Sequence, residues 1–296
     1  MKLCLNILEI LSILIIVCLI VCLIISHFEN RRLNVTRYQI RDSRIPAAFN
    51  GYHIVHLSDL HNASFGEQNE RLISRVKELE PDIILITGDM IIGKPGVDVT
   101  FAADTINALS KVAPVCFSMG NHELRASIYT DTYGDMWKDF SSRLLPEVKV
   151  LQDEEVLIHK ESDVIHLYGL NLTPELYKRL IRTPMPSDYL VSLFGKCNFD
   201  EYHIFMAHNP DYFKEYAAWG ANLTFAGHIH GGMIRLPLVG GVLSPMIHFF
   251  PKYDKGLFTE NNKYMILSGG LGNHTFKIRV NNVPEIVSAT LYQETM

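Results

Sequence analysis

Apolar residues form short runs that alternate with helix-spaced stretches along the middle of the chain. The runs 52–58, 82–87 and 114–119 are short and rich in β-branched or apolar residues, which predicts buried strands. Between them, 67–80 and 98–111 carry apolar side chains at helical spacing. Farther along, strand-like runs at 203–207 and 222–226 flank a helical stretch at 211–218. The alternation predicts an α/β layer structure.

The C-terminal part of the chain has a different pattern. Strand-like runs at 264–268 and 285–292 are separated by turn residues with no helical stretch between them. This favours antiparallel strands that close a second sheet. We therefore expect one catalytic domain over residues 51–296, preceded by a polar, Arg-rich connector at 27–50.

The N-terminus is nearly all apolar, with an uninterrupted run over 10–25. A membrane-spanning helix needs about 20 apolar residues. The alternative is a cleaved signal peptide, but its apolar core would be shorter, and Ile24 and Ser26 make a poor cleavage site. We expect an uncleaved, single-pass anchor to the cell membrane over residues 1–26. Arginines follow the span and favour a cytoplasmic domain, but a large domain can defeat that bias, so the side of the membrane stays open.

Composition and charge narrow the class of protein. With 48% hydrophobic and 20% charged residues, the chain has ample material for a globular core. Its formal net charge of -5 provides no basic field that would attract a polyanion. We therefore expect no nucleic-acid partner.

Polar residues that can bind a metal follow five of the predicted strands. They are Asp59, His61, Asp89, Asn121, His122, His208, His228 and His230. Each alone has an ordinary explanation as a turn, helix-capping or hydrogen-bonded residue. Because an open α/β sheet places its ligands at the carboxyl ends of its strands, one shared site explains all five positions better than five separate roles.

The series resembles the five motifs of the calcineurin-like metallophosphoesterase superfamily: Asp-x-His, Gly-Asp, Gly-Asn-His-Asp/Glu, His and Gly-His-x-His. The resemblance implies a four-layer α/β/β/α sandwich with a dinuclear metal centre. It assigns a first metal to Asp59, His61, Asp89 and His230, and a second to Asp89, Asn121, His208 and His228. Asp89 would bridge the two ions, and His122 would be the catalytic residue.

The ligand types suggest the chemistry. Mixed oxygen and imidazole ligands suit Mn, Fe or Zn better than Ca or Mg, so we expect two divalent transition metal ions whose identity stays open. Such a pair can share a hydroxide that attacks phosphorus. His122 would then protonate the leaving oxygen or stabilise the developing charge. Glu123 either orients His122 or caps a helix.

One position departs from the protein phosphatases of this superfamily. Their second motif continues Gly-Asp-x-Val-Asp-Arg-Gly, whereas residues 88–93 read Gly-Asp-Met-Ile-Ile-Gly, with Ile92 where the second Asp would stand. A phosphoprotein phosphatase is therefore not expected. The partner of His122 stays open.

Segments 231–237, 250–257 and 268–272 resemble the branch of membrane-associated bacterial metallophosphoesterases. That branch includes phosphodiesterases and UDP-2,3-diacylglucosamine diphosphatases of the lipid A pathway. The resemblance implies a metal-dependent hydrolase of a phosphoester or pyrophosphate bond, with a lipid-linked substrate such as UDP-2,3-diacylglucosamine. The alternatives are a general phosphodiesterase or nuclease, and a catalytically silent membrane scaffold.

The apolar segment 236–250 follows the last histidine motif closely. It could accept acyl chains or touch the bilayer. The favoured alternative is a buried insertion that completes the second sheet, because most apolar runs are core. Arg235, Lys252 and Lys255 are candidates to bind a second phosphate, with a solvated surface role as the alternative for each.

Overall fold

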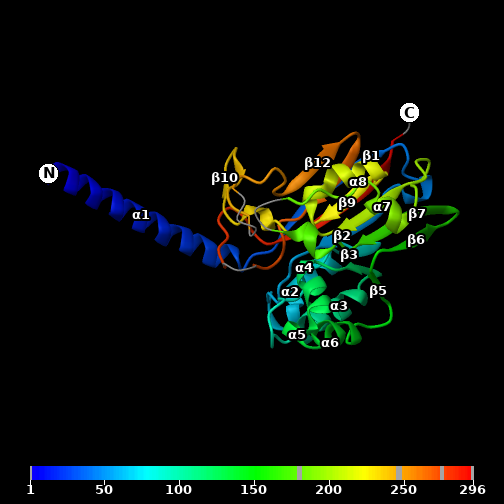
Figure 1. Ribbon diagram of the computed structural model, residues 1–296, viewed down its shortest axis with the longest axis horizontal. Helices are drawn as coiled ribbons and strands as arrows, with labels where there is room; N and C mark the ends of the chain where they lie inside the picture. Colours follow the sequence, from blue (N-terminus) through cyan, green and yellow to red (C-terminus); the bar gives the residue numbers. More distant parts are fainter. Residues whose placement is uncertain (1, 179–181, 245–248, 274–276, 295–296) are drawn as a thin grey trace.

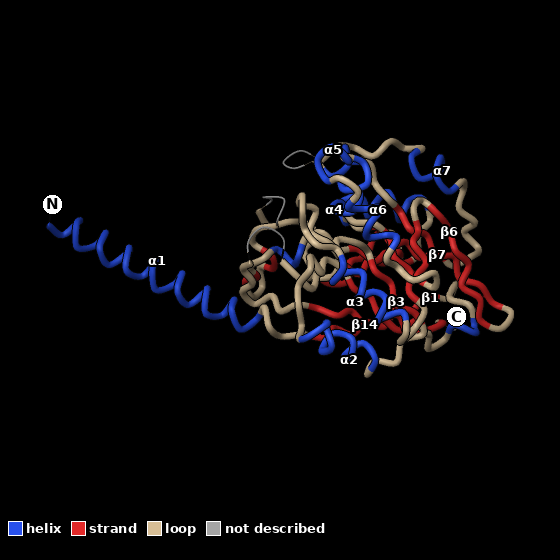
Figure 2. Tube along the Cα trace, turned by 90° about the horizontal axis from the view of Figure 1, so that it is seen from below, coloured by secondary structure: helices blue, strands red, loops and turns tan. Residues whose placement is uncertain are grey.

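The computed structural model describes residues 2–178, 182–244, 249–273 and 277–294. Two six-stranded sheets form the body (Figures 1 and 2). The first has the order β1-β14-β2-β3-β4-β5, with bounds Asn34–Asp42, Glu285–Gln293, His53–Leu57, Ile83–Ile86, Val115–Ser118 and Val148–Leu151. The second has the order β12-β13-β9-β8-β7-β6, with bounds Gly256–Glu260, Lys263–Leu267, Leu223–Ala226, His203–Ala207, Asp163–Leu170 and Glu154–Lys160.

Helices cover the outer faces of both sheets. They are α2 Glu70–Lys77, α3 Thr100–Ser110, α4 Asn121–Ile128, α5 Thr130–Tyr133, α6 Met136–Ser142, α7 Tyr189–Phe194 and α8 Phe213–Trp219. Short 3₁₀ turns are η1 Ala47–Phe49, η2 Glu67–Asn69, η3 Pro174–Tyr177, η4 Pro210–Tyr212 and η5 His230–Gly232. A central core lies between the sheets, and further cores lie under α2, α3, α4 and α6 and under α7 and α8. The predicted four-layer α/β/β/α arrangement is confirmed.

The N-terminal helix α1 (Lys2–Glu29) projects from the body as a separate rod (Figures 1 and 2). Within it, Asn6–Glu29 is long and apolar enough to cross a membrane by length and composition. Most of its apolar side chains are exposed. A helix that exposes apolar side chains all round needs an apolar solvent or a covering partner.

The expectation for the C-terminal strands was wrong in part. β13 does join the second sheet, antiparallel to β12 and parallel to β9, but β14 returns to the first sheet between β1 and β2. The physical reason is that β14 is buried on both faces over most of its length. Ile286 packs beneath the helices, whereas Val287 and Ala289 pack between the sheets. A strand covered on both faces takes a central position.

Two further segments differ from their predicted roles. Part of the predicted connector 27–50 forms β1, an edge strand that pairs parallel to β14 along its whole length. The apolar segment 236–250 does not complete the second sheet. It contributes a separate two-stranded ribbon, β10 Arg235–Leu236 and β11 Gly240–Gly241, and its residues 245–248 lie outside the described part of the chain.

Candidate metal centre

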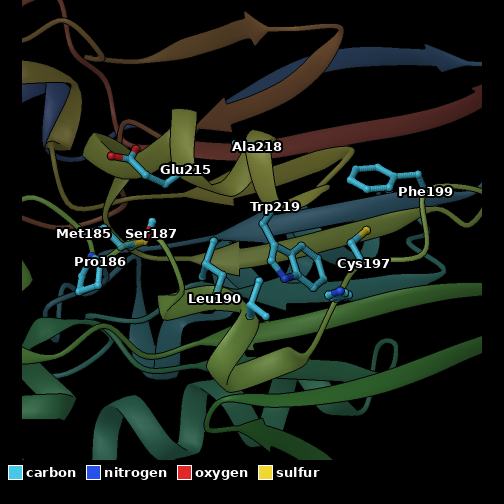
Figure 3. Close-up of a pocket in the computed structure, with 11 residues that line it drawn as sticks. Met185, Pro186, Ser187, Leu190, Cys197, Phe199, Glu215, Ala218 and Trp219 are labelled. Carbon is cyan, nitrogen blue, oxygen red and sulfur yellow. The ribbon is translucent and has the colours of Figure 1, made fainter.

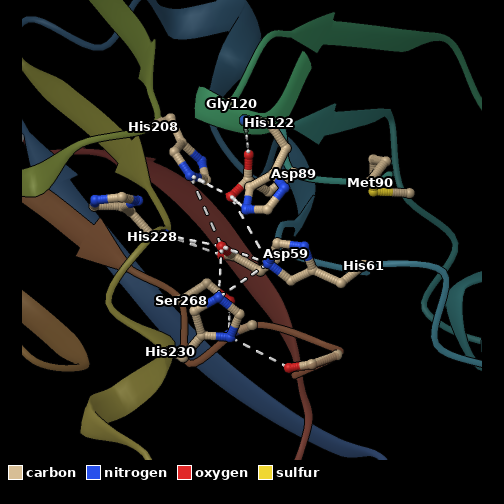
Figure 4. Close-up of polar contacts among 12 residues, drawn as sticks. Asp59, His61, Asp89, Met90, Gly120, His122, His208, His228, His230 and Ser268 are labelled. Atoms are coloured by element: carbon tan, nitrogen blue, oxygen red, sulfur yellow. Dashed lines mark hydrogen bonds and ion pairs between the residues drawn. The ribbon is translucent and has the colours of Figure 1, made fainter. Parts of the chain in front are cut away.

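The carboxyl ends of five strands bring the predicted ligands together. Strands β2, β3 and β4 are parallel neighbours in the first sheet, and β8 and β9 are parallel neighbours in the second. Parallel neighbours deliver their following loops to one edge. The loops carry Asp59, His61, Asp89, Asn121, His122, His208, His228 and His230, and Figure 4 shows most of these side chains converging on one point.

The distances define two adjoining groups of donor atoms. In the first, His230 Nε2 lies 3.2 Å from Asp59 Oδ1 and 3.1 Å from His61 Nε2. In the second, His208 Nε2 lies 3.2 Å from Asp89 Oδ2, and the donor atoms of Asp89, His208 and His228 all lie within 4.8 Å of one another. Asp89 Oδ2 also lies 3.7 Å from His61 Nε2, so it joins the two groups.

Buried polar atoms without partners indicate that these groups suit cations. Asn121 Oδ1 and His228 Nε2 are buried and have no hydrogen-bond partner among the described residues. A buried polar group without a partner costs about 1–3 kcal/mol. Carboxylate, amide and imidazole donors are the ligand set that Mn, Fe and Zn accept. The residues present therefore fit a pair of divalent ions.

The outer nitrogens of two imidazoles are fixed by backbone carbonyls. His208 Nδ1–H donates to the carbonyl oxygen of Thr87 at 2.6 Å, and His230 Nδ1–H donates to that of Gly272 at 3.2 Å. With the proton on Nδ1, the lone pair lies on Nε2, which faces the cluster. This orientation by a second hydrogen bond is typical of histidines that bind metals.

The backbone of the cluster is unusual. Positive φ values occur at Asp59, His61, Asp89, His228 and His230, five of the seven predicted ligands. A non-glycine residue in this region is uncommon, and such strain costs about 1–3 kcal/mol per residue. The fold holds these residues in place with hydrogen bonds, such as those from the His228 N–H to both carboxylate oxygens of Asp59 at 3.1 Å.

Gly120 allows the loops after β3 and β4 to approach closely. A Cβ atom at this position would lie 2.2 Å from Asp89 Oδ1. That contact is too short for any side chain, so the close approach requires glycine. The close approach also lets the His122 N–H donate to Asp89 Oδ1 at 2.8 Å.

Glu123 is a buried carboxylate that holds the loop after β3. Its oxygens accept the N–H groups of Asp89 at 2.8 Å, Met90 at 2.8 Å, Ile91 at 3.1 Å and Gly120 at 3.0 Å. Burial and the neighbouring Asp89 raise the pKa of Glu123 to about 7. Glu123 was expected either to orient His122 or to cap a helix. Its hydrogen bonds fit the capping role, because the bond from the Gly120 N–H caps α4. The other three bonds hold the loop that carries Asp89.

Burial and neighbouring charges set the protonation of the histidines. Burial, followed by the adjacent His208, lowers the pKa of His228 to about 3. Burial lowers the pKa of His61 well below its ordinary value. Both imidazoles are therefore neutral near pH 7, which is the form that binds a cation. Burial also lowers the pKa of His208, but its carboxylate neighbours, chiefly Asp89, outweigh burial and raise it to about 9. Without a cation the Nε2 atom of this ring is therefore protonated near pH 7, and a cation that binds there displaces this proton.

Comparison with known proteins agrees with this arrangement. The calcineurin-like phosphoesterase family profile matches residues 52–232, which include every predicted metal ligand. The chain belongs to the calcineurin-like phosphoesterase family. It is therefore a phosphoesterase, of a fold that uses a dinuclear metal centre.

Three relatives match this chain over most of their own length. The chain is 28% identical to the uncharacterized metallophosphoesterase YkuE of Bacillus subtilis, over 90% of this chain and 87% of YkuE. It is 24% identical to the phosphodiesterase YaeI of Escherichia coli, over 81% and 82% of the two chains. It is 26% identical to the UDP-2,3-diacylglucosamine pyrophosphatase LpxG of Chlamydia trachomatis, over 88% and 90%. Two of these names, a phosphodiesterase and a UDP-2,3-diacylglucosamine pyrophosphatase, are the activities of the branch that the sequence resembles.

In this phosphoesterase a backbone N–H orients the ring of His122, where the protein phosphatases of the superfamily have an Asp and this chain has Ile92. The Gly93 N–H donates to His122 Nδ1 at 2.6 Å. Since Nδ1 accepts a hydrogen bond, the neutral ring carries its proton on Nε2. That atom faces the cluster and lies 3.8 Å from Asp89 Oδ2. Sequence motifs did not reveal this contact because a backbone N–H leaves no residue signature.

Tyr177 is a neighbour of the cluster that the sequence did not reveal. It ends η3, and its ring packs edge-on against His228 with centroids 5.4 Å apart. Its hydroxyl is buried and has no hydrogen-bond partner among the described residues. Burial, followed by the negative charge of Asp89, raises its pKa well above the ordinary value. The phenol therefore keeps its proton and can donate it in a hydrogen bond. No predicted element or motif covers η3, so no signal pointed to this residue.

The three predicted phosphate-binding cations each have an intramolecular partner. Arg235 pairs with Asp254 at 2.9 Å, and Lys255 pairs with the buried Glu285 at 3.0 Å. Lys252 Nζ donates to the hydroxyl of Tyr253 at 2.7 Å. Within the described ranges, none of these contacts joins the cations to the histidine cluster. A role in binding phosphate stays a prediction.

An apolar pocket of about 580 Å³ lies between α7 and α8 (Figure 3). Its lining includes Met185, Leu190 and Trp219, and no predicted metal ligand. Trp219 belongs to the core beneath these helices. The pocket is therefore a surface opening of that core and not part of the cluster.

Proposed function

We propose that this phosphoesterase hydrolyses a phosphodiester or pyrophosphate bond in a lipid-linked substrate at a membrane. The observation that carries the proposal is the buried cluster of two carboxylates and four imidazoles, joined by Asp89. The apolar helix α1 supports the membrane location. The relatives include one named a phosphodiesterase and one named a UDP-2,3-diacylglucosamine pyrophosphatase, which supports the substrate class.

We assign the ligands to two ions. Asp59, His61, Asp89 and His230 hold the first ion, and Asp89, Asn121, His208 and His228 hold the second. The groups of donor atoms described above support the placement of the Asp and His ligands. The buried Asn121 Oδ1, which has no hydrogen-bond partner among the described residues, supports a ligand role for Asn121. When bound, two Mn, Fe or Zn ions supply a hydroxide nucleophile at neutral pH and stabilise the charge on the phosphoryl oxygens.

His122 acts on the leaving oxygen in this proposal. The N–H of Gly93 fixes the ring so that Nε2–H points toward the cluster. From there the neutral ring donates an Nε2–H hydrogen bond at the place where charge develops on the leaving oxygen. The ring needs no carboxylate partner for this orientation.

Tyr177 supplies a second hydrogen-bond donor in this proposal. Its buried hydroxyl lies beside the ring of a proposed metal ligand and has no partner among the described residues. We expect Tyr177→Phe to lower kcat about 10²-fold with little change in KM, because a lost donor to the transition state typically costs this much. Steady-state kinetics on a soluble phosphodiester measure the effect. Tyr129→Phe, at a tyrosine that is 45% exposed, is the matched control. A Tyr177→Phe enzyme with wild-type kcat would contradict the assignment.

The domain division is also part of the proposal. Residues 1–26 form the anchor, residues 27–50 link it to the catalytic body, and residues 51–296 form the phosphoesterase domain. Within the link, β1 already pairs with β14 of the body. The anchor therefore leads directly into the sheet without a long free tether.

The substrate class has a direct test. The full-length protein in detergent with Mn²⁺ should hydrolyse UDP-2,3-diacylglucosamine with a kcat/KM at least about 10-fold above that for UDP-N-acetylglucosamine, which corresponds to about 1.4 kcal/mol from acyl contacts. Bis(4-nitrophenyl) phosphate serves as the generic phosphodiester. Equal rates on all three substrates would contradict the preference for a lipid-linked substrate but would still support phosphodiesterase activity. Degradation of DNA at a comparable rate would favour the nuclease. No turnover and no bound metal would favour the silent scaffold.

A further inference from the structure

The ribbon formed by β10 and β11 exposes large apolar side chains at its tip. Leu238 is fully exposed, and Val239 and Leu236 are 57% and 46% exposed. Phe249 and Phe250 are 68% and 59% exposed, and they adjoin the ribbon through the bridge from Leu243 to Phe249. We call these five residues the apolar tip. Several large apolar side chains exposed on one short stretch of a soluble surface are unusual and mark a contact with a partner or a membrane.

The backbone conformation at Leu238, in the apolar tip, is energetically unfavourable for a leucine in a solvent-exposed turn. Leu238 has a φ of 66°, in the left-handed region. Turns that need this conformation are normally made with Gly, Asn or Asp. A leucine here is both strained and exposed, so neither local geometry nor solubility explains it. Such strain is commonly kept where function requires a particular side chain.

The base of the ribbon is fixed to the end of α1 through the segment 277–282. On one side, the Arg235 N–H donates to the carbonyl oxygen of Val280 at 2.9 Å. On the other side, Glu29 of α1 accepts the N–H groups of Asn281 and Asn282 at 3.0 and 2.9 Å. Ser26 of α1 also accepts the Arg279 N–H at 3.0 Å. The ribbon and the end of the helix are thus parts of one hydrogen-bonded unit.

This unit reaches the metal centre. The side-chain amide of Asn282 donates to the carbonyl oxygen of His230 at 2.6 Å. Turn η5, which begins with His230, leads within three residues into β10. The body thus presents the apolar tip, the end of α1 and one side of the metal centre at the same end, as Figure 1 shows for α1 and β10.

Exposed cations lie at this end of the body. Arg31 and Arg32 follow α1 directly, and Lys277 adjoins the segment that holds α1. Basic residues beside a membrane helix attract anionic lipid headgroups. Exposed apolar side chains and exposed cations at one end of the body match a lipid surface better than they match another copy of this acidic chain.

We propose that the apolar tip inserts into the same bilayer that α1 spans and so forms a second membrane contact that holds the metal centre against the lipid headgroups. The inference rests on the proposed role of α1 as an uncleaved anchor. A single helix alone would leave the body free to tilt. With two contacts on one rigid unit, the body has a fixed orientation, and a phosphate at headgroup level lies next to His230.

The experiment uses the full chain in vesicles of phosphatidylcholine and phosphatidylglycerol, with and without bromine on the acyl chains. Leu238→Trp places a fluorophore at the apolar tip. Leu157→Trp, at a leucine that is 44% exposed on the distant strand β6, is the matched control. The native Trp137 and Trp219 are present in both variants and contribute equally. We expect brominated lipid to quench Leu238→Trp, together with a blue shift of its emission, and to leave the control unchanged.

The outcomes separate the contact from the proposed activity. Quenching of Leu238→Trp no greater than that of Leu157→Trp, in protein that floats with the vesicles, would overturn the inference. A blue shift without quenching would also overturn it, because the tip would then be covered by protein. Hydrolysis of bis(4-nitrophenyl) phosphate by the same preparation reports the activity independently. Quenching without hydrolysis would support the membrane contact and contradict the proposed function.

Discussion

Asp89→Asn should abolish most of the phosphoesterase activity, with kcat lower by on the order of 10³-fold or more. Asp89 Oδ2 joins the two groups of donor atoms, with His208 at 3.2 Å and His61 at 3.7 Å. An amide lacks the negative charge that allows one oxygen atom to bridge two cations, and a single ion cannot grip both the attacking and the leaving oxygen. Steady-state hydrolysis of a soluble phosphodiester in the presence of Mn²⁺ measures the loss.

The control separates lost chemistry from lost folding. Asp200→Asn makes the same change at an exposed position and should keep wild-type activity. Circular dichroism of Asp89→Asn should match the wild type. Activity that persists in folded Asp89→Asn would refute the bridging assignment and with it the proposed dinuclear site.

His228→Ala should remove the second ion and leave the first. His228 Nε2 is buried without a hydrogen-bond partner among the described residues, and its low pKa keeps the imidazole neutral. We expect the bound metal to fall from about two ions per chain toward one, and kcat to fall about 10²-fold or more, since loss even of a residue that only supports a ligand costs 10–100-fold. Elemental analysis after gel filtration measures the stoichiometry.

His159→Ala is the matched control, because His159 is exposed on β6 and far from the cluster. It should retain both ions and full activity. Two ions per chain in the His228→Ala protein would show that His228 is not a ligand. One ion per chain together with full activity would show that the second ion is not needed for hydrolysis.

The cluster depends on residues that never touch a metal in our assignment. The carboxylate of Glu123 holds the loop after β3 by four N–H groups, and Gly120 lets the next loop approach Asp89. This support explains how five strained residues can persist side by side. It also places Glu123 and Gly120 among positions where substitution should weaken metal binding without removing a ligand.

The sequence by itself determined the repeating strand and helix pattern and the order of the ligand series. Buried parallel strands need unbroken apolar runs, and their carboxyl ends need polar residues at fixed offsets. Both signals are local, so they can be read without the fold. The runs 82–87 and 203–207 correspond to β3 and β8, and the residues after them lie in the cluster.

Only the tertiary structure decided which segments meet. β14 was predicted to close the second sheet, yet it lies between β1 and β2, because pairing depends on which apolar faces are left uncovered and not on order along the chain. Tyr177, the Gly93 N–H and the contact of Glu29 with 281–282 likewise join residues distant in sequence or use backbone atoms. Such contacts leave no periodicity or motif. The candidate ligands of the site could therefore be predicted from short stretches of sequence. The contacts that hold these ligands in place, and the orientation of the site toward the end of α1, arise from long-range packing.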